Sequence, residues 1–208
     1  NLGEIDYEDT HLGHMAERLR RGFYGTMQWA ILEVSAYEMV NGRCRIYLTS
    51  AGGIATTVSR LAKRVILEHN TYHNPNVRYL HDTYEPTECG RGRGPIPVLT
   101  PYGRVGNNYI DIDPGKIVGV VECCIPEEAR SFKAVDEYTS KMGQYVAEFL
   151  ANDLRQGRIP PHFLPIQSGV GATGNAVMAA LGSNPHIPQF NVYSEVVQDA
   201  AIRLMLDG

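Results

Sequence analysis

The sequence predicts an α/β protein in which open, mostly parallel sheets carry flanking helices. A nearly continuous apolar run at 28–35 is typical of a strand in a parallel sheet that is covered on both faces, and the run at 63–70 predicts the next strand. Between them lie a turn at Gly52 and Gly53 and a helical segment at about 54–62. The order strand, turn, helix, strand is that of a βαβ unit. A third apolar run, at 116–122, predicts another strand.

The remaining segments add smaller elements and one long helix. A helix is predicted at 11–22 and a short strand at 44–48, and 125–132 reads as a linker. The longest helix, at about 133–156, is predicted from apolar residues at three- and four-residue spacing. These residues are Val135, Tyr138, Met142, Tyr145, Val146, Phe149, Leu150 and Leu154. A short strand, a glycine turn and a helix follow over 163–182, and then a strand at 191–199 leads into a last helix.

Composition excludes several classes of protein. The 208 residues carry a formal net charge of -4, which argues against a general nucleic-acid binder. No apolar run approaches the ~20 residues needed to span a bilayer, and the acidic segment 1–10 is not a signal peptide. The four cysteines form no C-x-x-C pair, so reduced thiols in a cytoplasmic protein are expected. No acidic third ligand accompanies His11 and His14, so no metal site is predicted.

A glycine-rich turn at 168–175 is the first candidate for chemistry. Gly169, Gly171 and Gly174 match the spacing G-x-G-x-x-G at a predicted strand-to-helix turn. Glycine allows close approach to the backbone, and free N–H groups at the following helix start favour a phosphate, carboxylate or thioester oxygen. The acidic residue that a dinucleotide site requires is not cleanly placed. A tight turn without a ligand is therefore an equal interpretation of this segment alone.

Glu195 is the second candidate, because a carboxylate in an apolar, β-branched run is costly to bury unless it is paired or used. Strand alternation would place it on one face with Tyr193 and Val197. An exposed residue on an edge strand is the simpler interpretation from the residues alone.

A third group of residues lies in and before the loop at 85–108, which is rich in glycine and proline. His81 and Asp82 suggest acid–base work, although a hydrogen-bonded loop pair is favoured. Arg91, Arg93 and Arg104 suit phosphate, and a solvated basic loop explains them equally well.

Taken together, the motifs resemble the acetyl-CoA hydrolase/transferase family, which includes succinyl-CoA:acetate CoA-transferases. The resemblance covers RGFYGTMQWAILEVS (21–35), KRVILEHN, LHDTYEP, and PIPVLTPYGRVGNNYIDIDPGKIVGVVE (95–122). Its most specific parts are GRIPPHFLPIQSGVGATGNAVMAALG (157–182) and YSEVVQD (193–199). The run Ala172-Thr173-Gly174 departs from the family, which commonly has Asn after Gly-Val-Gly.

The resemblance implies specific roles. Glu195 would be the covalent nucleophile, with Gln167, Ser168, Gly169, Gly171 and Asn175 contacting CoA or substrate. The CoA thioester is the substrate, the second substrate is a small carboxylate, and no cofactor is implied. The family also implies a homodimer. Residues 1–128 would form the C-terminal part of a first CoA-transferase domain and 129–208 the N-terminal part of a second, so that the chain is an internal segment of a longer protein.

The expected function is transfer of CoA between an acyl-CoA and a small acid of the acetate/succinate class, or hydrolysis of acetyl-CoA. The motif YSEVVQD fits the acetate/succinate branch better than the alternatives, which are butyrate, 4-hydroxybutyrate and propionate. A Rossmann-type nucleotide-binding domain built on the three glycines is a second alternative from a different class.

Overall fold

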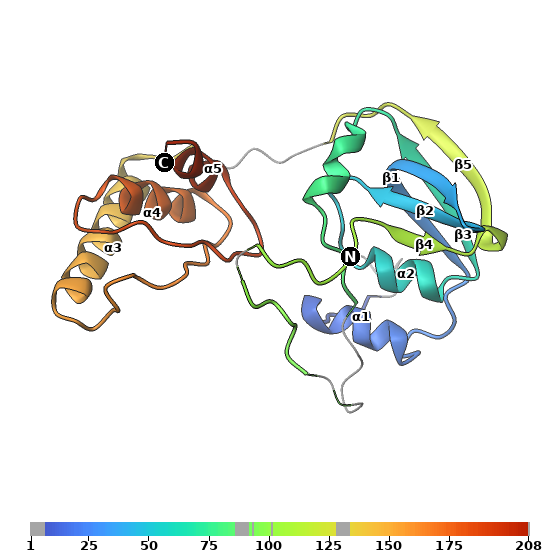
Figure 1. Ribbon diagram of the computed structural model, residues 1–208, viewed down its shortest axis with the longest axis horizontal. Helices are drawn as coiled ribbons and strands as arrows, with labels where there is room; N and C mark the ends of the chain where they lie inside the picture. Colours follow the sequence, from blue (N-terminus) through green and yellow to red (C-terminus); the bar gives the residue numbers. More distant parts are fainter. Residues whose placement is uncertain (1–6, 86–91, 93, 101, 128–133, 208) are drawn as a thin grey trace. The chain divides into compact units, whose positions relative to one another are not determined.

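The computed structural model describes residues 7–85, 92, 94–100, 102–127 and 134–207. The chain forms two compact units, Asn1–Glu127 and Glu128–Gly208 (Figure 1). Each unit is described by itself below.

The first unit is built on a five-stranded sheet in the order β4-β2-β1-β3-β5. The strands are β1 Trp29–Val40, β2 Arg43–Leu48, β3 Arg64–Asn70, β4 Ile110–Ile112 and β5 Ile117–Cys123. β1, β3 and β5 are parallel neighbours, whereas β2 runs antiparallel to both β1 and β4. The helical elements are α1 Leu12–Arg20, α2 Ala55–Leu61, η1 Pro75–Leu80 and η2 Pro114–Lys116. The expected α/β class with a mostly parallel sheet is confirmed.

A tight hairpin joins β1 to β2. Val40 pairs with Arg43, which leaves Asn41 and Gly42 as the two-residue turn, and both have positive φ angles of 49° and 75°. Asn-Gly is the preferred sequence of such a turn, since Asn tolerates the left-handed region and glycine enters it without strain. The hairpin extends the first strand five residues beyond the predicted end at Ser35, where a bulge interrupts the register between Val34 and Ala36.

One face of the sheet carries the core of this unit. Side chains of β1, β2, β3 and β4 pack there with Ala55 and Val58 of α2. On β1, Ala30, Leu32 and Val34 are buried, whereas Trp29 and Ile31 between them are 50% and 67% exposed. The expectation that this strand is covered on both faces is therefore wrong for the described residues. Within the first unit, no described element covers Trp29 and Ile31, so burial along this part of the strand alternates in that unit.

Polar contacts fix the chain where it enters and leaves the sheet. The side-chain amide of Asn70, at the end of β3, donates to the carbonyl of Ile125 at 2.8 Å and to Glu33 at 2.7 Å. Its oxygen accepts from the backbone N–H of Tyr72 and of Ile125. Asn70 is 3% exposed. Its two contacts with Ile125 hold the chain after β5, and its contacts with Glu33 and Tyr72 join it to β1 and to the segment after β3.

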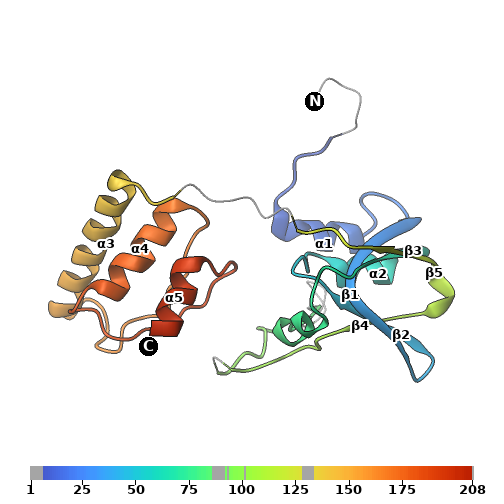
Figure 2. The same ribbon diagram turned by 90° about the horizontal axis from the view of Figure 1, so that it is seen from above.

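The second unit is a layer of three helices: α3 Glu137–Arg155, α4 Ala172–Ser183 and α5 Asp199–Asp207. α4 lies between α3 and α5 (Figure 2). α3 starts in a capping box. The side chain of Asp136 accepts a hydrogen bond from the N–H of Thr139, and the Thr139 hydroxyl oxygen accepts one from the N–H of Asp136. A Cβ on Gly143 would lie 2.5 Å from the carbonyl oxygen of Ala176, so glycine permits the close approach of α3 to α4.

The strands predicted in this unit are reduced to a single parallel bridge between Ile166 and Val192. Backbone hydrogen bonds run from Ile166 N–H to the Asn191 carbonyl and from Tyr193 N–H to the Ile166 carbonyl, at 2.9 and 3.0 Å. The segments 163–166 and 191–198 are otherwise irregular in the structure, and α5 begins at Asp199. A strand needs a ladder of partners, and in the described part of the chain these segments find only each other.

Candidate functional site

The glycine turn joins the bridge at Ile166 to the start of α4. Gly171 precedes the helix with a φ angle of +128°, a conformation that side-chain-bearing residues rarely adopt. Gly174 lies in the first turn of α4, where a Cβ would stand 2.3 Å from the carbonyl oxygen of Gly169. These two glycines are therefore explained by backbone conformation and by packing, without any need for a dinucleotide.

Gln198 holds this turn from the other side. Its side-chain oxygen accepts from the N–H of Gly171 at 2.9 Å, and its side-chain N–H donates to the carbonyl of Gly169 at 2.6 Å. The residue is 7% exposed and immediately precedes α5. The N–H groups at the start of this helix were expected to be free for a ligand, and the N–H of Gly171, the residue that caps the helix, is bonded to Gln198. Gln198 was missed as a site residue, although it belongs to the YSEVVQD motif three positions after Glu195.

Glu195 lies on an exposed bend between the bridge at Val192 and α5. The hydroxyl of Ser194 is 3.1 Å from the carbonyl oxygen of Ser168, so the residue before Glu195 contacts the glycine turn as well. The same hydroxyl is 2.9 Å from the carbonyl oxygen of Val196, and its one proton can serve one of the two at a time. Glu195 therefore sits in a short loop whose two ends, Ser194 and Gln198, both contact residues 168–171.

The other predicted residues of this site have distinct positions. Gln167 and Gly169 are exposed, whereas Ser168, Gly171 and Asn175 are partly buried. The side-chain oxygen of Asn175 accepts from the N–H of Ala200 at 3.4 Å, which links α4 to the first turn of α5. The structure thus brings the glycine turn, Asn175 and the loop of Glu195 into one neighbourhood of the second unit.

Two described candidates in the first unit, Asp82 and Arg104, bond to backbone groups on the two sides of the loop at 85–108. Asp82 accepts from the N–H groups of Val105 and Gly106, and Arg104 donates to the carbonyls of Tyr79 and His81. The favoured interpretation of a hydrogen-bonded loop pair thus holds for Asp82, and Arg104 binds backbone carbonyls. Arg91 and Arg93 lie outside the described residues.

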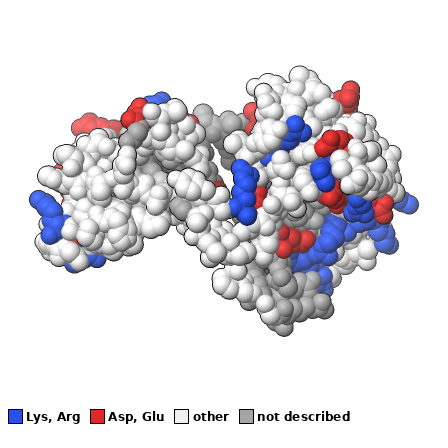
Figure 3. All heavy atoms as spheres, in the orientation of Figure 1, with Lys and Arg blue, Asp and Glu red and all other residues white. Residues whose placement is uncertain are grey.

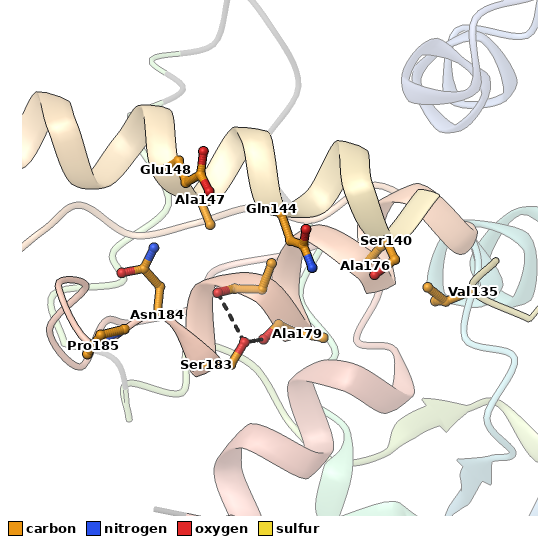
Figure 4. A pocket seen from close by; sticks show the side chains of 11 residues that line it. Val135, Ser140, Gln144, Ala147, Glu148, Ala176, Ala179, Ser183, Asn184 and Pro185 are labelled. Atoms are coloured by element: carbon orange, nitrogen blue, oxygen red, sulfur yellow. Dashed lines mark hydrogen bonds between the residues drawn. The ribbon is translucent and has the colours of Figure 1, made fainter. Parts of the chain in front are cut away.

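Two cavities of the second unit lie away from Glu195. One, of about 350 Å³ between α3 and α4, is lined largely by small and polar side chains, including Ala176, Ser183 and Asn184 (Figure 4). The other, of about 650 Å³, is lined by Met178, Leu181, Phe190 and Leu204 among others, with Gln189 and Asn191 in the same lining. Neither cavity is lined by Glu195 or by residues 167–171. The candidate site is therefore identified from the chemistry of its side chains, because neither cavity marks it.

Charged side chains are distributed differently over the two units on the one face that is drawn in Figure 3. On the face in Figure 3, basic and acidic side chains lie next to one another over the first unit, and much of the second is uncharged. Within the described part of the chain, no helix has both the length and the apolar character to cross a membrane. Among the same residues, no three His, Cys, Asp or Glu side chains gather closely enough to hold a metal ion.

Sequence relatives cover the whole chain. It is 40% identical over 208 residues to a propanoyl-CoA:succinate CoA transferase of Escherichia coli and 31% identical over 208 residues to a succinyl-CoA:acetate CoA-transferase of Clostridium kluyveri. It is 30% identical over 212 residues to an acetyl-CoA hydrolase of Neurospora crassa. All of this chain is aligned in each case, and it spans 42%, 38% and 40% of these relatives.

Solved structures share the fold. A 4-hydroxybutyrate CoA-transferase from Porphyromonas gingivalis aligns with 97% of this chain and 39% of its own, at a TM-score of 0.57 and 18% identity. RipA from Yersinia pestis aligns with 98% of this chain and 36% of its own, at a TM-score of 0.56 and 18% identity. Residues 1–122 match the acetyl-CoA hydrolase/transferase N-terminal domain. The chain therefore belongs to the acetyl-CoA hydrolase/transferase family.

Proposed function

We propose that the protein containing this chain transfers CoA between an acyl-CoA and a small carboxylic acid, with Glu195 as the covalent nucleophile. The observation that carries the proposal is the loop of Glu195, which contacts the glycine turn through both Ser194 and Gln198. Relatives named as CoA transferases match this chain along its whole length. The names of these relatives make propionate, acetate and succinate the first acids to test.

The chemistry needs only a well-placed carboxylate. The Glu195 carboxylate attacks the acyl carbonyl, the C–S bond breaks, and CoA leaves as a thiolate, which gives a mixed anhydride. The thiolate then attacks the glutamyl carbonyl, and the acyl group leaves as a free carboxylate, so that CoA is held as a glutamyl thioester. A second carboxylate reverses these steps. A free carboxylate is a weak nucleophile, and positioning against the thioester supplies the rate.

Hydrolysis of acetyl-CoA is the second candidate, because relatives covering this chain are named acetyl-CoA hydrolases. Both reactions share the steps up to the covalent intermediate. They differ in whether water or a carboxylate attacks the covalent intermediate. Exclusion of water from the site therefore decides between hydrolysis and transfer.

We also propose the domain roles and the assembly. Residues 1–128 would be the C-terminal part of a first CoA-transferase domain and 129–208 the N-terminal part of a second, so that both units contribute to one enzyme. The division of the chain into two units near residue 127 supports this assignment. A homodimer and a cytoplasmic location complete the proposal. The free thiols of Cys44, Cys123 and Cys124 agree with a reducing compartment, and light scattering of the full-length protein tests the dimer.

Replacing Glu195 tests the nucleophile. We expect Glu195→Ala in the full-length protein to lower turnover of propanoyl-CoA, succinyl-CoA and acetyl-CoA by at least about 1000-fold, since the covalent path is lost. Intact mass after incubation with each acyl-CoA should show a CoA adduct in the wild type, mapped to the peptide of Glu195, and none in the variant. Running the assay with and without added acid separates transfer from hydrolysis.

Glu148→Ala is the matched control, because Glu148 is also an exposed glutamate of the second unit, on α3. It should form the adduct at the wild-type rate. Near-normal exchange by Glu195→Ala, or an adduct that maps elsewhere, would show that the nucleophile is assigned wrongly.

A further inference from the structure

We infer that Gln198 is a positioning residue for the carboxylate of Glu195, an inference that rests on the proposed function. Gln198 would act without touching substrate, by locking the loop of Glu195 onto the glycine turn. The inference depends on the two hydrogen bonds of one buried amide and on the position of Glu195 three residues before it.

The amide of Gln198 bonds to the turn through both its oxygen and its nitrogen. It accepts from Gly171 N–H and donates to the Gly169 carbonyl, so donor and acceptor are each used across two residues of the same backbone. Because the residue is only 7% exposed, water cannot readily replace these bonds if they are lost. The two contacts fix both the position and the orientation of the amide plane.

The backbone of Gln198 is fixed at the same time. The N–H of Ile202 donates to its carbonyl at 3.2 Å in the first turn of α5. The N–H of Ala200, in that same turn, meets the side chain of Asn175 on α4. The start of α5 is thus tied to the glycine turn through Gln198 and to α4 through Ala200.

Only three residues, 195–197, separate Gln198 from Ser194, whose hydroxyl reaches the carbonyl of Ser168. All three are exposed, so burial of their own side chains does little to hold them. A three-residue loop anchored at both ends has little freedom, and its anchors set where Glu195 stands. Release of the anchor at Gln198 would let the carboxylate move relative to the turn.

Such movement matters for catalysis more than for binding. A reacting group displaced by about 1 Å can lose on the order of 100-fold in rate while the substrate still binds. Most of an acyl-CoA molecule would be held by contacts other than Gln198. Loss of the clamp should therefore lower kcat and leave KM for the acyl-CoA nearly unchanged.

The test uses Gln198→Met in the full-length enzyme, because methionine keeps the length and bulk of the side chain and removes both hydrogen bonds. We expect kcat to fall by about 10- to 100-fold, KM for the acyl-CoA to stay within about threefold, and the Glu195 thioester to form correspondingly more slowly by rapid-quench intact mass. Gln156→Ala, which removes a glutamine amide at the end of α3, should leave kcat unchanged.

Loss of stability alone is separated from mispositioning by Leu181→Ala, a cavity variant in the core of the same unit. The positioning role is overturned if Gln198→Met keeps the wild-type kcat. It is also overturned if Leu181→Ala, compared under conditions in which the two variants have the same melting temperature, loses as much kcat as Gln198→Met. Absence of any thioester and of turnover in the wild type would overturn the proposed function and this inference together. A wild-type thioester rate retained by Gln198→Met would overturn the inference alone.

Discussion

At the scale of single residues, the three glycines of one turn have different physical requirements. Gly171 adopts a positive φ angle, Gly174 is too close to a carbonyl oxygen for a Cβ, and a Cβ on Gly169 would meet nothing within 4 Å. A match to G-x-G-x-x-G does not show which of the three positions requires glycine, because the pattern says only that no side chain is present there. The requirement for glycine is strict where the backbone dictates it, at Gly171 and Gly174.

The contrast between Gly174 and Gly169 gives a prediction for stability. Alanine at position 174 would favour the helix by up to about 1 kcal/mol from intrinsic propensity. The overlap with the Gly169 carbonyl should outweigh this and destabilise the unit by about 1–3 kcal/mol. Thermal unfolding of Gly174→Ala measures the loss, and Gly169→Ala serves as the stability control with little change expected. Equal melting temperatures for the two variants would mean that the turn yields to the extra methyl group.

At the scale of elements, α3 buries a different face from its apolar stripe. The sequence places large apolar residues along one side, yet Tyr138, Met142, Tyr145 and Phe149 are at least half exposed. The contact with α4 is made where Gly143, Ala147 and Ala151 are buried. Small side chains allow two helix backbones to approach closely, so the residues that matter most for this packing carry little hydrophobic signal.

This difference can be measured on α3 itself. Ala147 is 2% exposed against α4, so Ala147→Leu should overpack the contact and destabilise the unit by about 1–3 kcal/mol. Tyr145→Ala, on the exposed stripe, should change the free energy of unfolding by less than about 0.5 kcal/mol. Denaturant unfolding of this chain compares the two. A larger loss from Tyr145→Ala would show that the stripe is the packing face.

At the scale of the whole molecule, one ion-pair cluster ties separate parts of the first unit together. Glu85 accepts from Arg20 of α1 at 3.1 Å, from Thr57 of α2 at 2.7 Å and from Arg60 of α2 at 3.2 Å. The side chain of Arg20 is 6% exposed, so its charge depends on this partner. Burial alone would raise the pKa of Glu85, but the hydrogen bonds from Arg60, Thr57 and Arg20 outweigh it and lower the pKa.

The lowered pKa of Glu85 predicts a pH dependence of stability. The unfolded chain binds this proton more tightly than the folded one, so the carboxylate stabilises the fold above the ordinary glutamate value of about 4.3 and the contribution is lost as pH falls through the lowered pKa. Glu85→Gln should cost about 1–3 kcal/mol at pH 7, because it leaves the charge of Arg20 without its partner. The difference from the wild type should shrink below about pH 4 in denaturant titrations. A difference that is independent of pH would contradict this account.

The sequence alone determined the fold class, the family and most of the elements; β4 was not predicted, and two strands predicted in the second unit are not formed. Nearly continuous apolar runs, glycine turns and helix periodicity are local signals, and they placed α1, α2, β2, β3 and β5 close to their observed bounds. Glu195 and the glycine turn were found as motifs for the same reason, and their catalytic roles stay predictions. The Asn-Gly hairpin signal at positions 41 and 42 was present in the sequence and was overlooked.

Tertiary structure decided which faces and which polar groups have partners. What packs against each segment decides the exposure of Trp29, the burial of Ala147 and the reduction of two predicted strands to one bridge. The spacing of apolar residues along the sequence does not encode these contacts. The two hydrogen bonds of Gln198 join residues 27 and 29 positions apart. Such contacts depend on the path of the chain between them, so the clamp on the glycine turn became visible only in three dimensions.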